Sequence, residues 1–230
     1  MSNDKKRQDF DLTDAAAVAL VVVQGAVAFC IYQFGPTGPI AVHFDFHGQA
    51  NGWGDRNTLA IGVAIAGAVT LLINLMLRLN LFTGLPNDSR TNAVARALIV
   101  AVGALVTGLL ASLAFANGTG FGQQRLPLTI AWLMFVVVGA LVGKAAPNAF
   151  IGVRVYWTLR SRLAWDKANR LLGRIFFFGG LIGLLAMPFI DLDHDFVLVM
   201  AWLLIVVVGG GVLAIIESWR VWRTDPERIP

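Results

Sequence analysis

Charged residues are scarce in this chain of 230 residues. Asp, Glu, Lys and Arg together make up 14% of it, whereas hydrophobic residues make up 57% and the mean hydropathy is +0.70. A soluble globular domain carries about a quarter of its residues as charged ones. The shortage excludes an ordinary soluble fold, and we predict an all-α polytopic membrane protein.

Cysteine is nearly absent, because Cys30 is the only one in the sequence. A lone cysteine excludes a disulfide framework and a cysteine-based metal site. The apolar run that contains it is too long for a secretory signal, and Phe29 is too large for a lipoprotein cleavage site in front of Cys30. We therefore expect residues 15–34 to form an uncleaved first span.

Catalytic motifs are missing as well. The sequence contains neither G-x-S-x-G nor H-E-x-x-H, which argues against serine and zinc hydrolysis. No acidic or basic residue falls near the middle of an apolar run, although ion-coupled transporters and proton pumps place such groups there. An intramembrane aspartyl protease would need a buried carboxylate pair. We predict a protein without catalytic activity and without a cofactor.

Six apolar runs are long enough to cross a hydrocarbon core of about 30 Å. If both termini are cytoplasmic, only Arg56 and Arg125 of the 18 Lys and Arg residues fall outside, whereas five or seven spans would spoil this asymmetry. Basic residues at span ends favour anionic lipid headgroups over nucleic acid. The predicted spans are 15–34, 58–79, 92–116, 126–142, 175–190 and 196–216. We divide the chain into residues 1–60 (tail, first span and outer loop), 61–125 (second and third spans) and 126–230 (three spans with a basic cytoplasmic loop).

The predicted outer loop, residues 35–57, carries two of the three histidines. His43, Asp45 and His47 alternate with apolar residues, which favours a short extended segment with these three side chains on one side. Imidazole and carboxylate together suit Zn²⁺ or a similar divalent ion, so the three are candidate metal ligands. In the alternative, aromatic residues anchor the loop in the membrane interface and the polar side chains face water. The aromatic residues concerned are Phe44, Phe46 and Trp53.

The predicted cytoplasmic loop, residues 143–174, is strongly basic. On a helical wheel its second half separates an apolar side from a basic one, so we predict an interfacial helix that is capped by Thr158 and runs into the fifth span. Such a helix either rests on lipid or docks a cytoplasmic protein. The apolar side holds Ala164, Trp165, Ala168, Leu171 and Leu172, and the basic side holds Arg162, Asp166, Lys167, Arg170 and Arg174.

Two pairs of glycines flank this loop at a spacing of four residues: Gly139 with Gly143, and Gly179 with Gly183. Small residues one turn apart let two helix backbones approach closely. The alternatives are packing of the fourth span on the fifth, and a dimer.

The same loop resembles the signature of the SdpI family of bacterial immunity membrane proteins. The positions that carry the resemblance are Pro147, Asn148, Gly152, Arg154, Trp157, Thr158, Leu159, Trp165 and Arg170. The chain departs from the family pattern at Ala140, at residues 155–156 and at residues 168–169. Residues 39–54 resemble a small domain of unknown function that often precedes this family's region.

The resemblance implies a multi-pass protein of the bacterial cytoplasmic membrane that gives immunity to, or senses, a secreted membrane-active toxic peptide. It also implies that the inner loop holds a cytoplasmic repressor at the membrane. We predict that the toxin meets the outer loop and the repressor the basic loop. The alternatives are a metal-dependent membrane enzyme that uses the outer His and Asp residues, and a transporter of a hydrophobic compound. The predicted toxin contacts are His43, Asp45, Gly48, Asn51 and Trp53.

Overall fold

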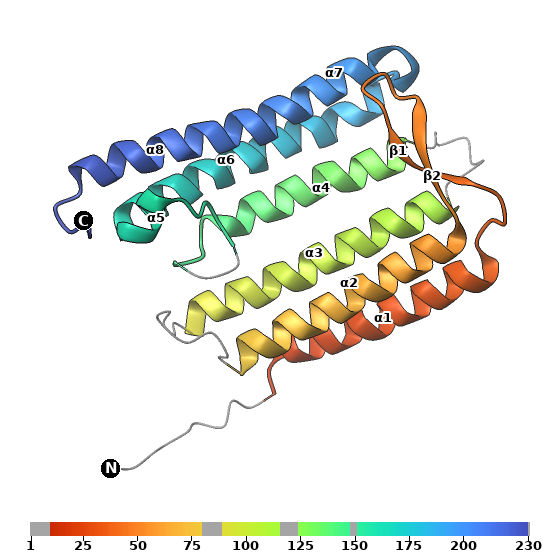
Figure 1. The fold of residues 1–230 in the computed structure, drawn as a ribbon, viewed down its shortest axis with the longest axis horizontal. Helices are drawn as coiled ribbons and strands as arrows, with labels where there is room; N and C mark the ends of the chain where they lie inside the picture. The colour runs from red at the N-terminus through yellow and green to blue at the C-terminus, as the bar shows by residue number, and fades with distance from the viewer. Residues whose placement is uncertain (1–9, 80–88, 116–123, 148–150, 230) are drawn as a thin grey trace.

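The computed structural model describes residues 10–79, 89–115, 124–147 and 151–229, and it is mostly helical (Figure 1). Six of its helices are long and apolar enough to cross a membrane, which confirms the predicted fold class and number of spans. The last span is a single run in which a π-helical segment joins two α-helices. The spans are α1 (Leu12–Phe34), α2 (Arg56–Arg78), α3 (Ser89–Phe115), α4 (Arg125–Val142), α6 (Arg162–Ala186) with the 3-10 turn η1 (Met187–Phe189), and α7 (Leu192–Leu204), η2 (Ile205–Gly209) and α8 (Gly210–Thr224).

Helices α1 and α2 begin earlier than predicted because polar residues cap them. The side chain of Asp11 accepts a hydrogen bond from the backbone N–H of Asp14 at 2.8 Å, and Asp14 returns the bond to the N–H of Asp11 at 3.0 Å. Asp55 accepts from both the backbone N–H and the hydroxyl of Thr58, each at 2.7 Å. A cap satisfies backbone donors that the first turn leaves free, so each helix starts in polar sequence ahead of its apolar run.

The spans form two halves that meet along α3 and α4. Helices α1, α2 and α3 pack on one another, while α4 packs on α6 and α6 packs on α8 (Figure 1). Inside the first half, the fully buried Gln24 donates from Nε2 to the hydroxyl of Thr107 at 3.0 Å and to the carbonyl of Gly103 at 3.3 Å. Both ends of the described chain lie at one end of the bundle, which we call the termini end.

A two-stranded antiparallel hairpin lies at the opposite end, which we call the hairpin end. Strand β1 (Ile40–Phe44) pairs with β2 (Ala50–Gly54), and Ile40 belongs to a buried cluster with Ile31 and Val63. The sequence correctly indicated an extended segment here. It did not indicate the second strand, because β2 contains two glycines and shows no run of alternating apolar residues.

Close glycine contacts join α4 to α6, as one of the two alternatives predicted. A Cβ atom at Gly139 would lie 2.3 Å from the backbone nitrogen of Phe177, and one at Gly183 would lie 2.4 Å from the ring of Trp132 on α4. Gly179 faces a different neighbour, Val206 of η2. Three of the four predicted glycines therefore pack α4 against α6, since Gly143 also lies against the backbone of Arg170.

The predicted start of the basic helix at Thr158 is wrong, whereas its continuation into the fifth span is confirmed. A short helix, α5 (Tyr156–Arg160), ends at Ser161, whose side chain caps α6 by accepting from the N–H of Ala164 at 2.9 Å. From Arg162 onward α6 is one continuous helix, so the basic segment forms the first turns of the fifth span. Thr158 lies inside α5 and does not cap α6. The apolar and basic sides were predicted correctly, because Ala164, Trp165 and Ala168 are buried while Arg162, Lys167, Arg170 and Arg174 are exposed.

Candidate functional site

At the hairpin end, Asp45 and Gly48 shape the turn between β1 and β2. One oxygen of the Asp45 carboxylate accepts hydrogen bonds from the backbone N–H groups of Gln49, at 2.9 Å, and His47, at 2.8 Å. These two bonds, that of Gln49 foremost, lower the pKa of Asp45 below its ordinary value, because they stabilise the ionised carboxylate. Gly48 adopts a left-handed backbone conformation, with φ of 81°, that favours glycine.

We expect the Asp45 carboxyl to titrate below the reference value of 3.8. Because the pKa is lowered in the folded protein, the turn's stabilisation is fully present above the unfolded pKa and is lost as the pH falls through the folded one. Carbon-13 NMR of the labelled aspartate carboxyl measures this midpoint, with the same protein in denaturant as the reference. A folded midpoint equal to or above the denatured one would contradict the assignment.

The hairpin tip connects the two halves of the bundle. A Cβ atom at Gly48 would lie 2.9 Å from the ring of Phe196 on α7, so the tip rests on that ring. The side-chain amide of Gln124, just before α4, donates to the carbonyl of Gly48 at 2.5 Å. The hairpin, which connects α1 to α2 in the first half, therefore contacts the second half directly.

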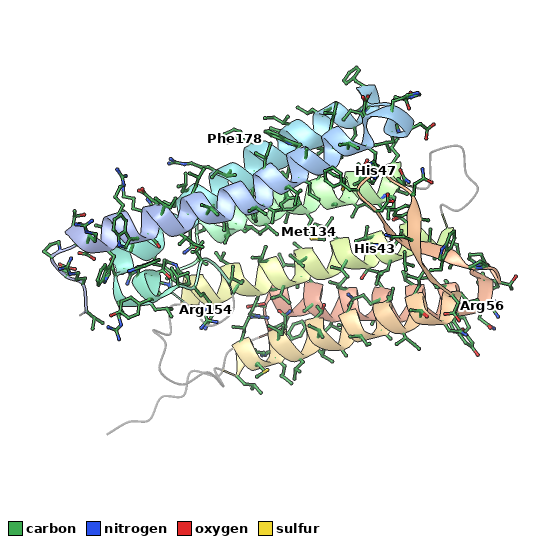
Figure 2. The ribbon with its side chains drawn as sticks, turned by 45° about the horizontal axis from the view of Figure 1, so that its top comes forward. His43, His47, Arg56, Met134, Arg154 and Phe178 are labelled. Atoms are coloured by element: carbon green, nitrogen blue, oxygen red, sulfur yellow. The ribbon has the colours of Figure 1, made fainter. Side chains whose placement is uncertain are left out.

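The other predicted toxin contacts lie on the two strands, with His43 on β1 (Figure 2) and Asn51 and Trp53 on β2. The ring of His43 lies 2.5 Å, Nδ1 to Oδ1, from Asn51 on the facing strand, so each of these side chains is already engaged. Trp53 is 59% exposed and Phe46 is 44% exposed, and each offers an apolar surface at this end. Within the described residues, no three His, Cys, Asp or Glu side chains form a group that could hold a metal ion. The geometry thus gives His43, Asp45 and His47 no shared metal position.

An acidic turn lies beside the hairpin at the start of α7. Asp191 accepts from the backbone N–H of Asp193 at 3.1 Å and pairs with the ring of His194 at 2.9 Å. The imidazole contact, followed by that backbone bond, lowers the pKa of Asp191. With Asp195 one turn into the helix, three carboxylates gather at this point, beside the His194 ring and Arg125, whose guanidinium donates to the carbonyls of Met187 and Ile190.

A cavity of about 240 Å³ opens between α6 and α7 next to the acidic turn. Its walls are mostly apolar, with Asp195 as the one acidic residue among them. The indole N–H of Trp132 is buried and, within the described part of the chain, has no hydrogen-bond partner. That of Trp202 donates to the carbonyl of Gly179 at 3.1 Å. The lining residues are Trp132, Ile182, Gly183, Ala186, Ile190, Asp195, Leu198, Val199 and Trp202.

At the termini end, three of the predicted signature residues hold the loop between α4 and α5 in place. The indole N–H of the fully buried Trp165 donates to the carbonyl of Ala145 at 2.9 Å. The hydroxyl of Thr158 donates to the carbonyl of Val153 at 2.7 Å. Gly152 adopts a φ of 117°, and a Cβ there would lie 2.5 Å from the side-chain oxygen of Asn169.

Asn169 belongs to this loop architecture, although sequence reasoning treated it only as a departure from the family pattern. It is 1% exposed, its side-chain oxygen accepts from the N–H of Val153 at 2.7 Å, and its amide donates to the carbonyl of Trp165 at 2.9 Å. The sequence offered one signal for this role, because Asn169 is a polar residue on the apolar side of the helical wheel. Among the remaining signature residues, Arg154, Leu159 and Arg170 are exposed, Pro147 and Trp157 are half-buried, and Asn148 lies outside the described residues.

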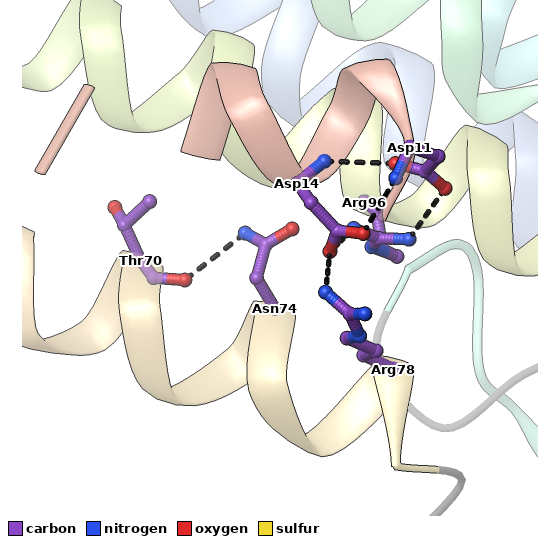
Figure 3. A network of polar contacts seen from close by, with 6 residues as sticks. All are labelled: Asp11, Asp14, Thr70, Asn74, Arg78 and Arg96. Atoms are coloured by element: carbon purple, nitrogen blue, oxygen red, sulfur yellow. Dashed lines mark hydrogen bonds and ion pairs between the residues drawn. The ribbon is translucent and has the colours of Figure 1, made fainter. Parts of the chain in front are cut away.

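An ion cluster at the termini end of the first half was also missed. Arg96 is 6% exposed and lies 2.5 Å from Asp14 and 3.1 Å from Asp11. Arg78 also lies 2.8 Å from Asp14, so one carboxylate oxygen receives two guanidinium groups (Figure 3). The cluster ties α1 to both α2 and α3.

Residues 144–217 match a family model described as the SdpI/YfhL protein family. This region, from the end of α4 into α8, is therefore an SdpI/YfhL family domain within a multi-pass membrane protein. Neither a curated protein nor a solved structure matches the chain.

Proposed function

We propose that this membrane protein, with its SdpI/YfhL family domain at residues 144–217, gives immunity to or senses a membrane-active toxic peptide. The peptide meets the hairpin end, and no catalytic step is involved. By the positive-inside rule the basic termini end faces the cytoplasm of a bacterium and the hairpin end faces outward. A secreted peptide would therefore reach the hairpin first.

The observation that carries this proposal is the mixture of surfaces at the hairpin end. Exposed aromatic side chains, the three carboxylates of the acidic turn and an apolar cavity lie at the same end of the bundle. A peptide that acts on membranes combines apolar and cationic groups, so it complements these surfaces. Trp53 is the strongest candidate contact, because a large exposed aromatic residue supplies much apolar area for binding.

The five proposed contacts have different roles. Trp53 offers its ring directly to the peptide, whereas Asp45 and Gly48 hold the turn in shape. His43 and Asn51 join the two strands and keep the Trp53 surface in position.

On the cytoplasmic side, the termini end would report the state of the hairpin end to a repressor protein. Exposed Arg154, Leu159 and Arg162 supply basic and apolar surface for such a partner. The last described residues contact this end as well, since the N–H of Ile229 donates to the carbonyl of Arg160 at 2.9 Å and the hydroxyl of Ser161 donates to Asp225 at 2.5 Å. A partner at this end would therefore meet an ordered surface.

The proposal is tested with cells that express the protein or lack it, exposed to a panel of cationic membrane-active peptides. We expect expression to raise the inhibitory concentration of at least one peptide. Trp53→Ala should reduce this protection by about tenfold or more, because truncating a central aromatic contact costs about 2 kcal/mol. The matched control is Trp219→Ala, which removes a half-exposed tryptophan at the opposite end. Equal sensitivity of expressing and non-expressing cells to every peptide would refute immunity.

A further inference from the structure

We propose that the termini end of the α4–α6 interface binds one anionic phospholipid of the surrounding leaflet. Arg170 and Arg174 would hold its phosphate, and the exposed face of α6 beyond them would hold an acyl chain. The proposal is independent of immunity and of any peptide.

The site is a cavity of about 230 Å³ on the surface of the bundle. Three glycines line it at the crossing of α4 and α6. These glycines also bring the helices together, since Gly173 and Gly139 each have the other's carbonyl oxygen within 2.8 Å of an ideal Cβ position. The lining residues are Gly139, Gly143, Arg170, Gly173, Arg174, Phe177 and Phe178.

The two arginines that line the cavity lack a protein counter-ion. Both are exposed, and in the described part of the chain neither forms an ion pair or a side-chain hydrogen bond. Asp166 lies one turn before Arg170 on α6 but forms no ion pair with it among the described residues. Two guanidinium groups one helical turn apart, without carboxylate partners, suit a phosphate group.

The length of α6 places these two arginines within reach of the lipid headgroups. The span from Arg162 to Phe189 has 28 residues. At a rise of 1.5 Å per residue it is about 42 Å long, roughly 12 Å more than the hydrocarbon core. If Phe189 marks the far boundary of the core, about eight residues project at the termini end. Arg170 then lies at the near boundary, and Arg174 lies about 6 Å inside it, from where its long side chain can extend to the headgroups.

The same face of α6 continues into the membrane as an apolar track. Phe178, Ile182 and Leu185 follow Arg174 at helical spacing and are 58%, 55% and 63% exposed. Figure 2 shows Phe178 projecting away from the bundle. A free phosphate or a cytoplasmic protein could reach the arginines but not this track, whereas a phospholipid can occupy both.

Native mass spectrometry of the detergent-purified protein tests the proposal, with phosphatidylglycerol and phosphatidylethanolamine as added lipids. We expect one phosphatidylglycerol to be retained in preference to phosphatidylethanolamine. The double variant Arg170→Gln/Arg174→Gln should bind phosphatidylglycerol about 30-fold more weakly, because each basic residue near an anionic headgroup contributes about 1 kcal/mol. The control Arg162→Gln/Lys167→Gln removes the same charge from the same helix outside the cavity and should change binding by less than about threefold.

Phe178→Ala tests the acyl-chain contact with both arginines intact, and it should also weaken phosphatidylglycerol binding. Equal retention of the two lipids would overturn the proposal. Equal losses in the two double variants would do so too, because they would show diffuse attraction to basic charge. Displacement of the lipid by millimolar inorganic phosphate would overturn the acyl-chain part. Unchanged lipid binding in Arg170→Gln/Arg174→Gln would overturn the proposed phosphate site, and a protein partner would then be the candidate ligand of these arginines.

Discussion

Replacing Arg96 with Ala should lower the free energy of unfolding by about 3–5 kcal/mol, because it removes one partner from a buried ion cluster. Arg96 bonds both Asp11 and Asp14, and the side chain of Asp14 is almost entirely buried. Without Arg96, Asp14 retains the backbone N–H of Asp11 and Arg78, which lies at the edge of the cluster. A buried carboxylate that loses its main partner is costly, since its desolvation is no longer offset.

Thermal or denaturant unfolding of the purified protein in mild detergent measures this loss. The control is Arg220→Ala, which breaks the exposed ion pair with Glu217 and should cost less than about 1 kcal/mol. A double change of Asp14→Asn with Arg96→Ala should recover part of the stability, because it removes the unpaired charge as well. Equal melting of Arg96→Ala and Arg220→Ala would show that the cluster does not stabilise the first half.

Replacing Gly139 with Ala should destabilise the second half by about 3 kcal/mol, the upper part of the usual range for overpacking. The added Cβ would lie 2.3 Å from the backbone nitrogen of Phe177 and 2.7 Å from the carbonyl oxygen of Gly173. Both neighbours are backbone atoms of α6, so the clash cannot be relieved by rotating a side chain. The two helices would have to move apart.

Gly25→Ala and Gly211→Ala are matched controls, because an ideal Cβ at either glycine has no described heavy atom within 4 Å apart from its own local helix. Alanine favours a helix over glycine by about 1 kcal/mol, so these two variants should be neutral or slightly stabilised. Unfolding of all three proteins is followed in the same detergent. If Gly139→Ala unfolds like the controls, close packing of α4 on α6 is not needed for stability.

Much of the helical architecture follows from the sequence, because lipid requires long apolar runs and small residues where helices touch. The predicted second span, residues 58–79, differs from α2 by only two residues at its start and one at its end. The last span was predicted too short at both ends. Its first turn contains Asp193 and Asp195, and its final turns carry Arg220 and Arg223, so hydropathy alone did not reveal its full length from Leu192 to Thr224.

The polar contacts between distant residues could not be predicted from one sequence. Arg96 and Asp14 are 82 positions apart, and nothing local indicates that they meet. Gln124 and Gly48 are 76 positions apart, and the hairpin that brings them together has a second strand without the usual pattern. The proposed contacts Trp53 and His43 were identified by residue type. Their roles, an exposed surface for Trp53 and a bond between strands for His43, depend on how β1 pairs with β2.

The docked hairpin tip has a mechanical consequence. Its position on Phe196 and Gln124 means that α1 and α2 cannot draw away from α4 and α7 at this end while the tip stays seated. The ion cluster at the opposite end joins only helices of the first half, through Asp11, Asp14, Arg78 and Arg96. Any spreading of the two halves near the hairpin must therefore break the contacts of this short tip with Phe196 and Gln124, in addition to the packing of α3 on α4.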